Sequence, residues 1–156
     1  MKSFSVHYKF SQHFDVPARK AYDWCTAYDP SDIELGGQKG SRSIKWLNDT
    51  ALVLTDSYFT GKSKVVKRRL IKLYPESLWW TNTRISADGK YSQFLYQILP
   101  EPGGSRLVFT GNQIYAGTAG ASRRAALARQ LAKEDAELWR VYAKEMAKDL
   151  AKREAK

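Results

Sequence analysis

The sequence predicts an α+β fold in which a seven-stranded, curved antiparallel sheet is covered by one long C-terminal helix. Three observations carry this prediction. Apolar residues recur at helical spacing near the C-terminus, for example at Leu131, Leu138 and Tyr142. Before that helix, short stretches of alternating polar and apolar residues are separated by typical turn sequences. Those turns are too short for the crossover that a parallel strand pair needs, so we expect antiparallel pairing.

The N-terminal part of the chain predicts one strand followed by two short helices. Residues Phe4–Phe14 alternate between apolar and polar, which is typical of a half-buried strand. Pro17 then suits the first turn of a helix over Ala18–Tyr28, and a second short helix is expected over Asp32–Leu35. The glycine-rich stretch Gly36–Gly40 predicts a flexible loop.

The middle of the chain predicts a meander of six strands, and the end predicts the long helix. Because a strongly twisted sheet curls, the helix over Ser122–Arg153 is expected to bury its apolar stripe in the concave side. Ser122 is the predicted N-cap of that helix. We expect residues 1–156 to form a single domain, which suits a chain of this length. The predicted strands are Ser43–Asn48, Ala51–Phe59, Ser63–Tyr74, Ser77–Ser86, Lys90–Leu99 and Arg106–Tyr115.

Composition indicates a basic protein of ordinary hydrophobicity. Lys and Arg total 26 against 16 for Asp and Glu, which gives a formal net charge of +10 and favours an anionic partner. No apolar run approaches the roughly 20 residues that span a bilayer, and the alternating N-terminus is unlike a signal peptide, so we expect a cytoplasmic protein. Cys25 is the only cysteine, which excludes an intrachain disulfide and a thiolate metal cluster. We expect no metal and no cofactor.

Two local sequences and the order of elements resemble the START-like, or SRPBCC, superfamily of Bet v 1 relatives and polyketide cyclases. Phe14-Asp15-Val16-Pro17-Ala18-Arg19-Lys20-Ala21-Tyr22 is similar to the start of that superfamily's first helix, and Leu99-Pro100-Glu101-Pro102-Gly103-Gly104-Ser105-Arg106-Leu107 to its last turn. The resemblance covers nearly the whole chain and implies a helix-grip fold. It also implies a hydrophobic cavity between sheet and helix for lipids, sterols, polyketides or other apolar ligands. Members include carriers, cyclases and chaperone-type cofactors, so the fold leaves the function open.

Aromatic and polar residues on the strands and the long helix are the candidates for lining that cavity. The alternative is that the aromatic rings interdigitate into a solid core. Asp135 interrupts the apolar stripe of the helix and would need a partner such as Arg69, Arg84 or a ligand cation, unless it reaches solvent. We expect the cavity to open near 36–40 and 116–120. The predicted ligand-binding residues are Tyr8, Phe10, Trp46, Leu54, Trp80, Asn82, Arg84, Leu95, Gln97, Asp135, Leu138 and Tyr142.

Other residues that often carry chemistry give weaker signals. His7 and His13 share the outer face of the first strand about 20 Å apart, too far to bind one metal ion. Cys25 falls on an apolar helix stripe, where a free cysteine behaves as a small hydrophobe. The segment 36–41 lacks the ending of a phosphate-binding loop and precedes a strand. The sequence therefore contains no recognisable catalytic set.

Three functions remain open at this point. The first is binding of a hydrophobic small molecule or lipid in the cavity. The second is a polyketide cyclase or dehydratase that would use residues such as Asp135, Arg84, Asn82 and Tyr142 for proton transfer and enolate stabilisation. The third is a basic module that docks on RNA, a ribosome or anionic lipid through the segment 62–72. Strand residues alternate faces, which would split that basic segment between two surfaces.

Overall fold

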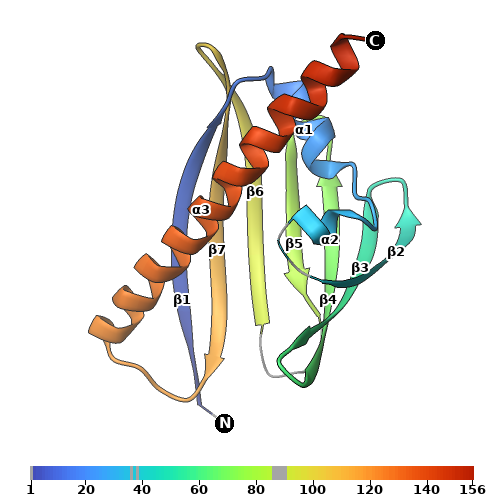
Figure 1. Ribbon diagram of the computed structural model, residues 1–156. Coiled ribbons are helices and arrows are strands. Elements are labelled where there is room, and N and C mark those ends of the chain that lie inside the picture. The colour runs from blue at the N-terminus through green and yellow to red at the C-terminus, as the bar shows by residue number, and fades with distance from the viewer. Residues whose placement is uncertain (1, 36, 38, 86–90) are drawn as a thin grey trace.

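The computed structural model describes residues 2–35, 37, 39–85 and 91–156. It contains one seven-stranded sheet with every neighbouring pair antiparallel, in the order β1-β7-β6-β5-β4-β3-β2 (Figure 1). The predicted fold class is confirmed. The strands are β1 Ser3–Phe14, β2 Gly40–Asn48, β3 Ala51–Thr60, β4 Ser63–Tyr74, β5 Trp79–Arg84, β6 Tyr91–Glu101 and β7 Gly104–Ala116. The helices are α1 Ala18–Thr26, α2 Asp32–Leu35 and α3 Ala121–Glu154.

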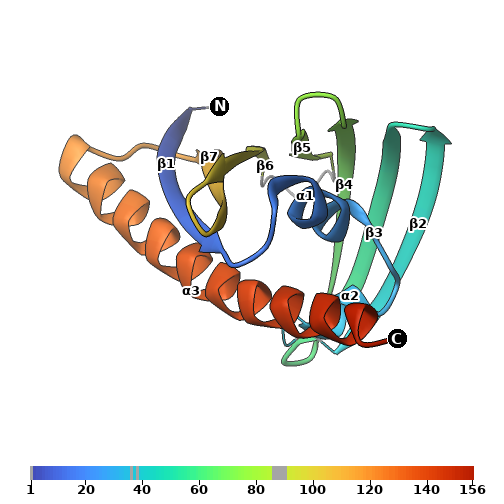
Figure 2. The same ribbon diagram turned by 90° about the horizontal axis from the view of Figure 1, so that it is seen from above.

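The helices occupy the concave side of the sheet. Figure 2 shows the sheet curving around α1 while α3 runs across the open side, from the β1 edge toward β2 and β3. Within α3, all of which the structure describes, only Met146 is fully buried. Leu131, Leu138 and Trp139 on the same helix are only half-buried. The helix therefore closes over one end of the core and leaves space beneath its middle.

The core itself consists of inward-facing residues from most strands. Leu52 of β3, Ile71 of β4 and Phe109 of β7 have no exposed surface, and Phe14 at the end of β1 joins them. At roughly 1.5–3 kcal/mol for each fully buried large apolar side chain, this cluster is a major source of stability. Among the described residues no helix is long and apolar enough to cross a membrane.

Several element boundaries differ from the predicted ones. Gly40 is the first residue of β2 and not part of a loop, because the edge strand approaches β3 so closely that a Cβ atom there would collide with the carbonyl oxygen of Ser57. Ser122 lies inside α3, where Gly120 is the N-cap and no side chain caps the helix. β5 begins at Trp79 since Leu78 has a left-handed φ of 56°. The predicted turn at 87–89, with Ser86 and Lys90, lies outside the described residues.

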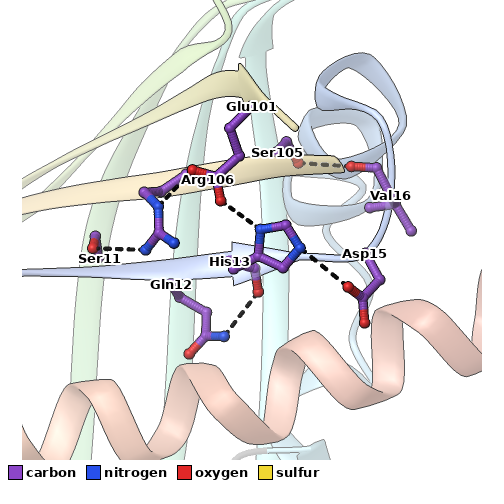
Figure 3. A network of polar contacts seen from close by, with 8 residues as sticks. All are labelled: Ser11, Gln12, His13, Asp15, Val16, Glu101, Ser105 and Arg106. Atoms are coloured by element: carbon purple, nitrogen blue, oxygen red, sulfur yellow. Dashed lines mark hydrogen bonds and ion pairs between the residues drawn. The ribbon is translucent and has the colours of Figure 1, made fainter. Parts of the chain in front are cut away.

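A polar network ties the end of β1 to the hairpin between β6 and β7 (Figure 3). His13 Nδ1 lies 2.5 Å from Glu101 Oε1, and its Nε2 lies 3.1 Å from Asp15 Oδ1. Arg106 donates from Nε to the other oxygen of Glu101 at 2.7 Å and from Nη1 to Ser11 at 3.0 Å. These carboxylates raise the pKa of His13, and the hydrogen bonds from Arg106 and His13 lower the pKa of Glu101. His13 is therefore ion-paired rather than merely solvated.

Candidate functional site

A pocket of about 650 Å³ lies between the concave face of the sheet and α3. Its floor comes from β3, β4, β5 and β6, its roof from α3, and one side from α1, α2 and the segment between them. A volume in this range is typical of sites for small molecules. The pocket therefore lies beside the packed core and is lined by some of its residues. Its sheet residues are Leu54, Lys67, Arg69, Trp80, Asn82, Phe94 and Tyr96, with Arg42 from the edge strand.

Aromatic rings form one wall of the pocket. Trp80 and Tyr96 face each other across the register of β5 and β6, and their rings stack with centroids 4.7 Å apart and planes within 1°. Trp139 from α3 approaches the Tyr96 ring at 5.6 Å, and Phe94 lies at 6.5 Å on the other side of it. This arrangement presents flat apolar surface to anything in the pocket, which suits a ligand with rings.

An ionic cluster around the buried Asp56 forms another wall, between the pocket and an adjoining hollow. Asp56, with only 5% of its surface exposed, accepts two hydrogen bonds from Arg42 at 2.7 and 3.0 Å and one from Arg69 at 2.5 Å. Burial alone would raise the pKa of Asp56, but the two guanidinium groups outweigh it and hold that pKa below its usual value. The three side chains come from β2, β3 and β4, whose registers bring them to one face. An adjoining hollow of about 200 Å³ shares Arg42, Lys67 and Arg69 with the main pocket.

Two buried polar atoms of this wall have no partner among the described residues: Arg69 Nε and Asn82 Oδ1. Asn82 is only 5% exposed, and it projects from the same face as Arg69 on the neighbouring strand. Each such orphan atom costs about 1–3 kcal/mol relative to a satisfied one, and they are rare in folded proteins. Both atoms belong to residues of the pocket lining, so this wall contains hydrogen-bonding groups without protein partners.

Asp135 on α3 is paired with Tyr8 of β1. The Tyr8 hydroxyl donates to Asp135 Oδ2 at 2.6 Å and accepts from Gln113 Nε2 at 3.4 Å. Burial raises the pKa of Asp135 even though the hydrogen bond from Tyr8 works against this, and burial and Asp135 together raise the pKa of the Tyr8 hydroxyl. Of the two alternatives that the sequence left open for Asp135, the structure shows a half-buried carboxyl group with a hydrogen-bond partner. Its partner is Tyr8 and not Arg69, because α3 packs against β1 at this point.

Several of the residues predicted from the sequence line the pocket, at buried or half-buried positions. Tyr8 and Phe10 face the same interior but lie beneath the pocket, where Phe10 stacks on Phe109 with ring centroids 4.6 Å apart. Arg84 shares a face with Asn82 and lies further along β5, outside the lining. The predicted residues in the lining are Leu54, Trp80, Asn82, Asp135, Leu138 and Tyr142.

Three of the predicted residues lie away from the pocket, and their placement is corrected. Leu95 and Gln97 alternate with Tyr96 on β6, so they point to the convex face of the sheet. Trp46 is opposite Leu52 in the register and has the predicted orientation, but it lies on the edge strand, beyond the helices, and is 50% exposed. Side-chain periodicity alone did not show which face of β6 is concave, or where the helical cover ends.

The predicted opening of the cavity is also corrected in part. Lining residues near α2 include Asp29, Asp32 and Leu35, next to the glycine-rich stretch. Gly36 and Gln38 of that stretch lie outside the described residues. The described residues of 116–120 contribute nothing to the lining.

The sequence reasoning missed the ionic cluster, although a signal for it exists. On β3, Asp56 continues the buried alternation of Leu52 and Leu54, so a carboxylate stands where the pattern requires an apolar side chain. The basic segment of β4 divides as predicted, because Lys67 and Arg69 line the pocket whereas Arg68 alternates to the other face. Trp24 and Tyr28 were missed as well. Cys25 borders the pocket, and burial raises the pKa of its thiol, which disfavours the reactive thiolate.

The sequence and the structure were compared with those of known proteins. No protein-family model matches the sequence, and no curated protein matches it. Solved structures do match the fold of this chain. The di-domain aromatase/cyclase StfQ of the steffimycin biosynthetic pathway is 14% identical with a TM-score of 0.73, over 94% of this chain and 52% of that chain. The aromatase/cyclase Zhui from Streptomyces sp. R1128 is 8% identical with a TM-score of 0.68, over 96% of each chain. Ara h 8.0201 is 12% identical with a TM-score of 0.68, over 93% of this chain and 99% of that chain.

The chain has the Bet v 1-like helix-grip fold. The resemblance expected from the sequence is thereby confirmed at the level of the fold. In this helix-grip protein the pocket lies between the gripped helix α3 and the sheet, where the resemblance implied a cavity. The low identities mean that the chemistry of the pocket has to be argued from its own residues.

Proposed function

We propose that this protein binds a hydrophobic small molecule with a ring system in the pocket between the sheet and α3. The observation that carries the proposal is the pocket of about 650 Å³ with the stacked pair Trp80 and Tyr96 on its wall. Flat aromatic surface favours a planar ligand over a flexible acyl chain, because stacking adds to the area that binding buries. The ligand would contact Leu54, Asn82, Leu138 and Tyr142 as well.

The solved structures of similar fold support the proposal at a coarse level. Two of them are described as aromatase/cyclases, one of them from a biosynthetic pathway. The shared fold and the pocket of this chain support small-molecule binding. The identity of the ligand has to come from the residues that differ.

The experiment is titration with the neutral fluorescent probe N-phenyl-1-naphthylamine, combined with native mass spectrometry of the purified protein. Leu138→Trp places a larger side chain in the pocket lining and is expected to weaken probe binding about ten-fold or more. Val141→Trp is the matched control, since Val141 lies on the same helix, is 48% exposed and is outside the lining. Probe fluorescence that does not respond to wild-type protein, or that falls equally with both variants, would contradict the proposal.

A second candidate function is a cyclase-type enzyme, and one observation favours it. Asp135 lines the pocket with a raised pKa, so its carboxyl group can hold or release a proton closer to neutral pH than an ordinary aspartate. Arg69 across the pocket could stabilise an enolate in such a reaction. Asp135→Asn retains an acceptor for Tyr8 but removes the titrating group.

This second candidate is tested with poly-β-ketone substrates of the kind that cyclases consume. Asp135→Asn is expected to abolish turnover and to leave ligand binding within about three-fold, because only the proton-transfer group is lost. Glu137→Gln, on the exposed side of the same helix, is the control. If the wild-type protein binds the ligand but shows no turnover, the enzyme function is contradicted and ligand binding remains the only proposed function.

A further inference from the structure

The charged wall of the pocket indicates what the ligand carries. We propose that the ligand is an aromatic carboxylic acid whose single carboxylate is held by Arg69 and Lys67 while its rings lie against Trp80 and Tyr96. This inference rests on the proposed ligand binding and deepens it, because it names the chemical class of the ligand. It draws on side chains of the ionic wall that the fold itself leaves unpaired.

The first step is the availability of hydrogen-bond donors. Asp56 occupies Nη2 of Arg69, which leaves the buried Nε–H without a partner among the described residues. Lys67 lies two residues earlier on the same face of β4 and lines the pocket. It makes no hydrogen bond or ion pair with any residue that the structure describes, and its ammonium group lies 5.3 Å from the centre of the Tyr58 ring. Two cationic side chains of the pocket lining thus have donors available to a ligand.

The second step is the local charge. Arg42, Arg69 and Lys67 supply three positive charges on this wall, and Asp56 and Asp32 supply two negative ones. Asp135 also interacts with Lys67, but it lies outside this smaller hollow and is hydrogen-bonded to Tyr8. With every group ionised, the charged residues that line the smaller hollow therefore have an excess of one positive charge, and a monoanion neutralises it. A phosphate monoester, with a charge near −2, would leave uncompensated negative charge in a partly desolvated site.

The third step concerns Asn82 Oδ1, the other buried atom of the wall without a hydrogen-bond partner. Asn82 follows Arg69 diagonally across β4 and β5, about 7–8 Å away by the geometry of a sheet. Its side-chain carbonyl needs a donor and its amide can give one. A hydroxyl group next to the carboxylate satisfies both requirements. The preferred member of the class is therefore a hydroxy-substituted aryl acid.

The test uses isothermal titration of a matched series of naphthalene probes into the wild-type protein. The series consists of 2-naphthoic acid, its methyl ester, 3-hydroxy-2-naphthoic acid and 2-naphthyl phosphate. We expect the acid to bind about ten-fold or more tightly than the neutral ester, since charge-assisted hydrogen bonds distinguish the two. The hydroxy acid is expected to bind more tightly still, and the phosphate more weakly than the acid.

Lys67→Gln is expected to reduce the preference for acid over ester about ten-fold. Lys64→Gln is the matched control, because Lys64 is exposed on the opposite face of β4. Asn82→Asp provides a second variant, since a carboxylate there can pair with Arg69 Nε and repel the ligand. We expect it to weaken binding of the acid more than binding of the ester, with a cooperative thermal transition showing that it folds.

The outcomes separate this inference from the proposed function. Equal affinity for acid and ester, or a Lys67→Gln variant that weakens both equally, would overturn the carboxylate assignment and leave hydrophobic binding intact. Tighter binding of the phosphate than of the acid would overturn the assignment to a monoanion. Binding of none of the probes would contradict the proposed function itself.

Discussion

The network around His13 and the cluster around Asp56 use similar charged groups in very different surroundings. The His13 side chain is 34% exposed, Asp15 83% and Glu101 24%. The Asp56 side chain is 6% exposed, Arg42 11% and Arg69 23%. In the first network Glu101 is shared by His13 and Arg106, and it pins a hairpin to the end of β1.

The comparison shows where charge is structural and where it is available for function. Exposed ion pairs add little to stability because water solvates their members equally well when they separate. Burial of two arginines and an aspartate is costly and is compensated only if the pairing is complete. The Asp56 cluster is incomplete at Arg69 Nε and faces the pocket. A costly and incomplete cluster is better explained by a ligand than by the fold.

The largest effect is expected when the carboxylate of Asp56 is removed from the buried cluster. Asp56→Ala leaves two buried guanidinium groups without their partner, and we expect a loss of about 3–5 kcal/mol in the free energy of unfolding, measured with urea. Asp15→Ala in the exposed network is the control and should change stability little. Equal effects of the two substitutions would show that burial does not separate the networks.

The next largest effect concerns the second buried pair of the pocket. Tyr8→Phe removes the hydrogen bond to Asp135 and is expected to cost about 1–3 kcal/mol in unfolding free energy, because the carboxyl group is left unsatisfied. Tyr91→Phe at an exposed position is the control. In the double variant with Asp135→Leu most of that loss should be recovered, since both polar partners are then absent. No recovery would show that Tyr8 acts through packing alone.

A smaller effect is expected from the pH dependence of Asp135. Its pKa in the folded state is raised above the unfolded value of about 3.9, so the native state binds the proton more tightly. The contribution of Asp135 to stability therefore improves as pH falls through the raised pKa toward the unfolded one, and worsens as pH rises. Asp135→Asn should gain stability over the wild type at neutral pH, and the gain should shrink toward pH 4. Chemical unfolding at a series of pH values measures it; a gain that grows on acidification would have the wrong sign.

The smallest effect is expected in the exposed network. Glu101 and Asp15 raise the pKa of His13 above its unfolded value of about 6.5. The stability that His13 contributes is therefore fully present below that value and is lost as pH rises through the raised pKa. Thermal unfolding of His13→Gln should lack this pH dependence, with His7→Gln on the same face as the control. High salt should diminish the difference, and an effect that salt leaves unchanged would argue against an exposed ion pair.

Much of the fold could be predicted because it depends on local patterns. The alternation in Phe4–Phe14 and the helical spacing of Leu131 and Leu138 need no knowledge of distant residues. For the same reason the boundaries that failed, at Gly40 and Ser122, are those where a neighbouring strand or the backbone decides the end of an element. Local chemistry at those positions was compatible with both alternatives.

The candidate site could be predicted only in part, because it depends on which faces meet. Trp80 was found as an aromatic residue on a strand, and Asn82 as a polar residue on the same strand. Leu95 was assigned to the wrong face because strand periodicity has two phases and only the covering helices select the concave one. The Asp135 position was recognised on its own helix, whereas its partner Tyr8 lies 127 residues away in sequence.

The sequence by itself determined the order of the elements, their antiparallel pairing and the need of one long helix for a sheet to cover it. These follow from periodicity and turn length, which act over a few residues. Only the tertiary structure decided that α3 buries Met146 and holds Leu138 away from the sheet, so that a pocket remains. It also decided that the register of three strands brings Arg42, Asp56 and Arg69 to one wall. Distances between elements depend on how residues from the whole chain pack together, so they cannot be predicted from a single segment.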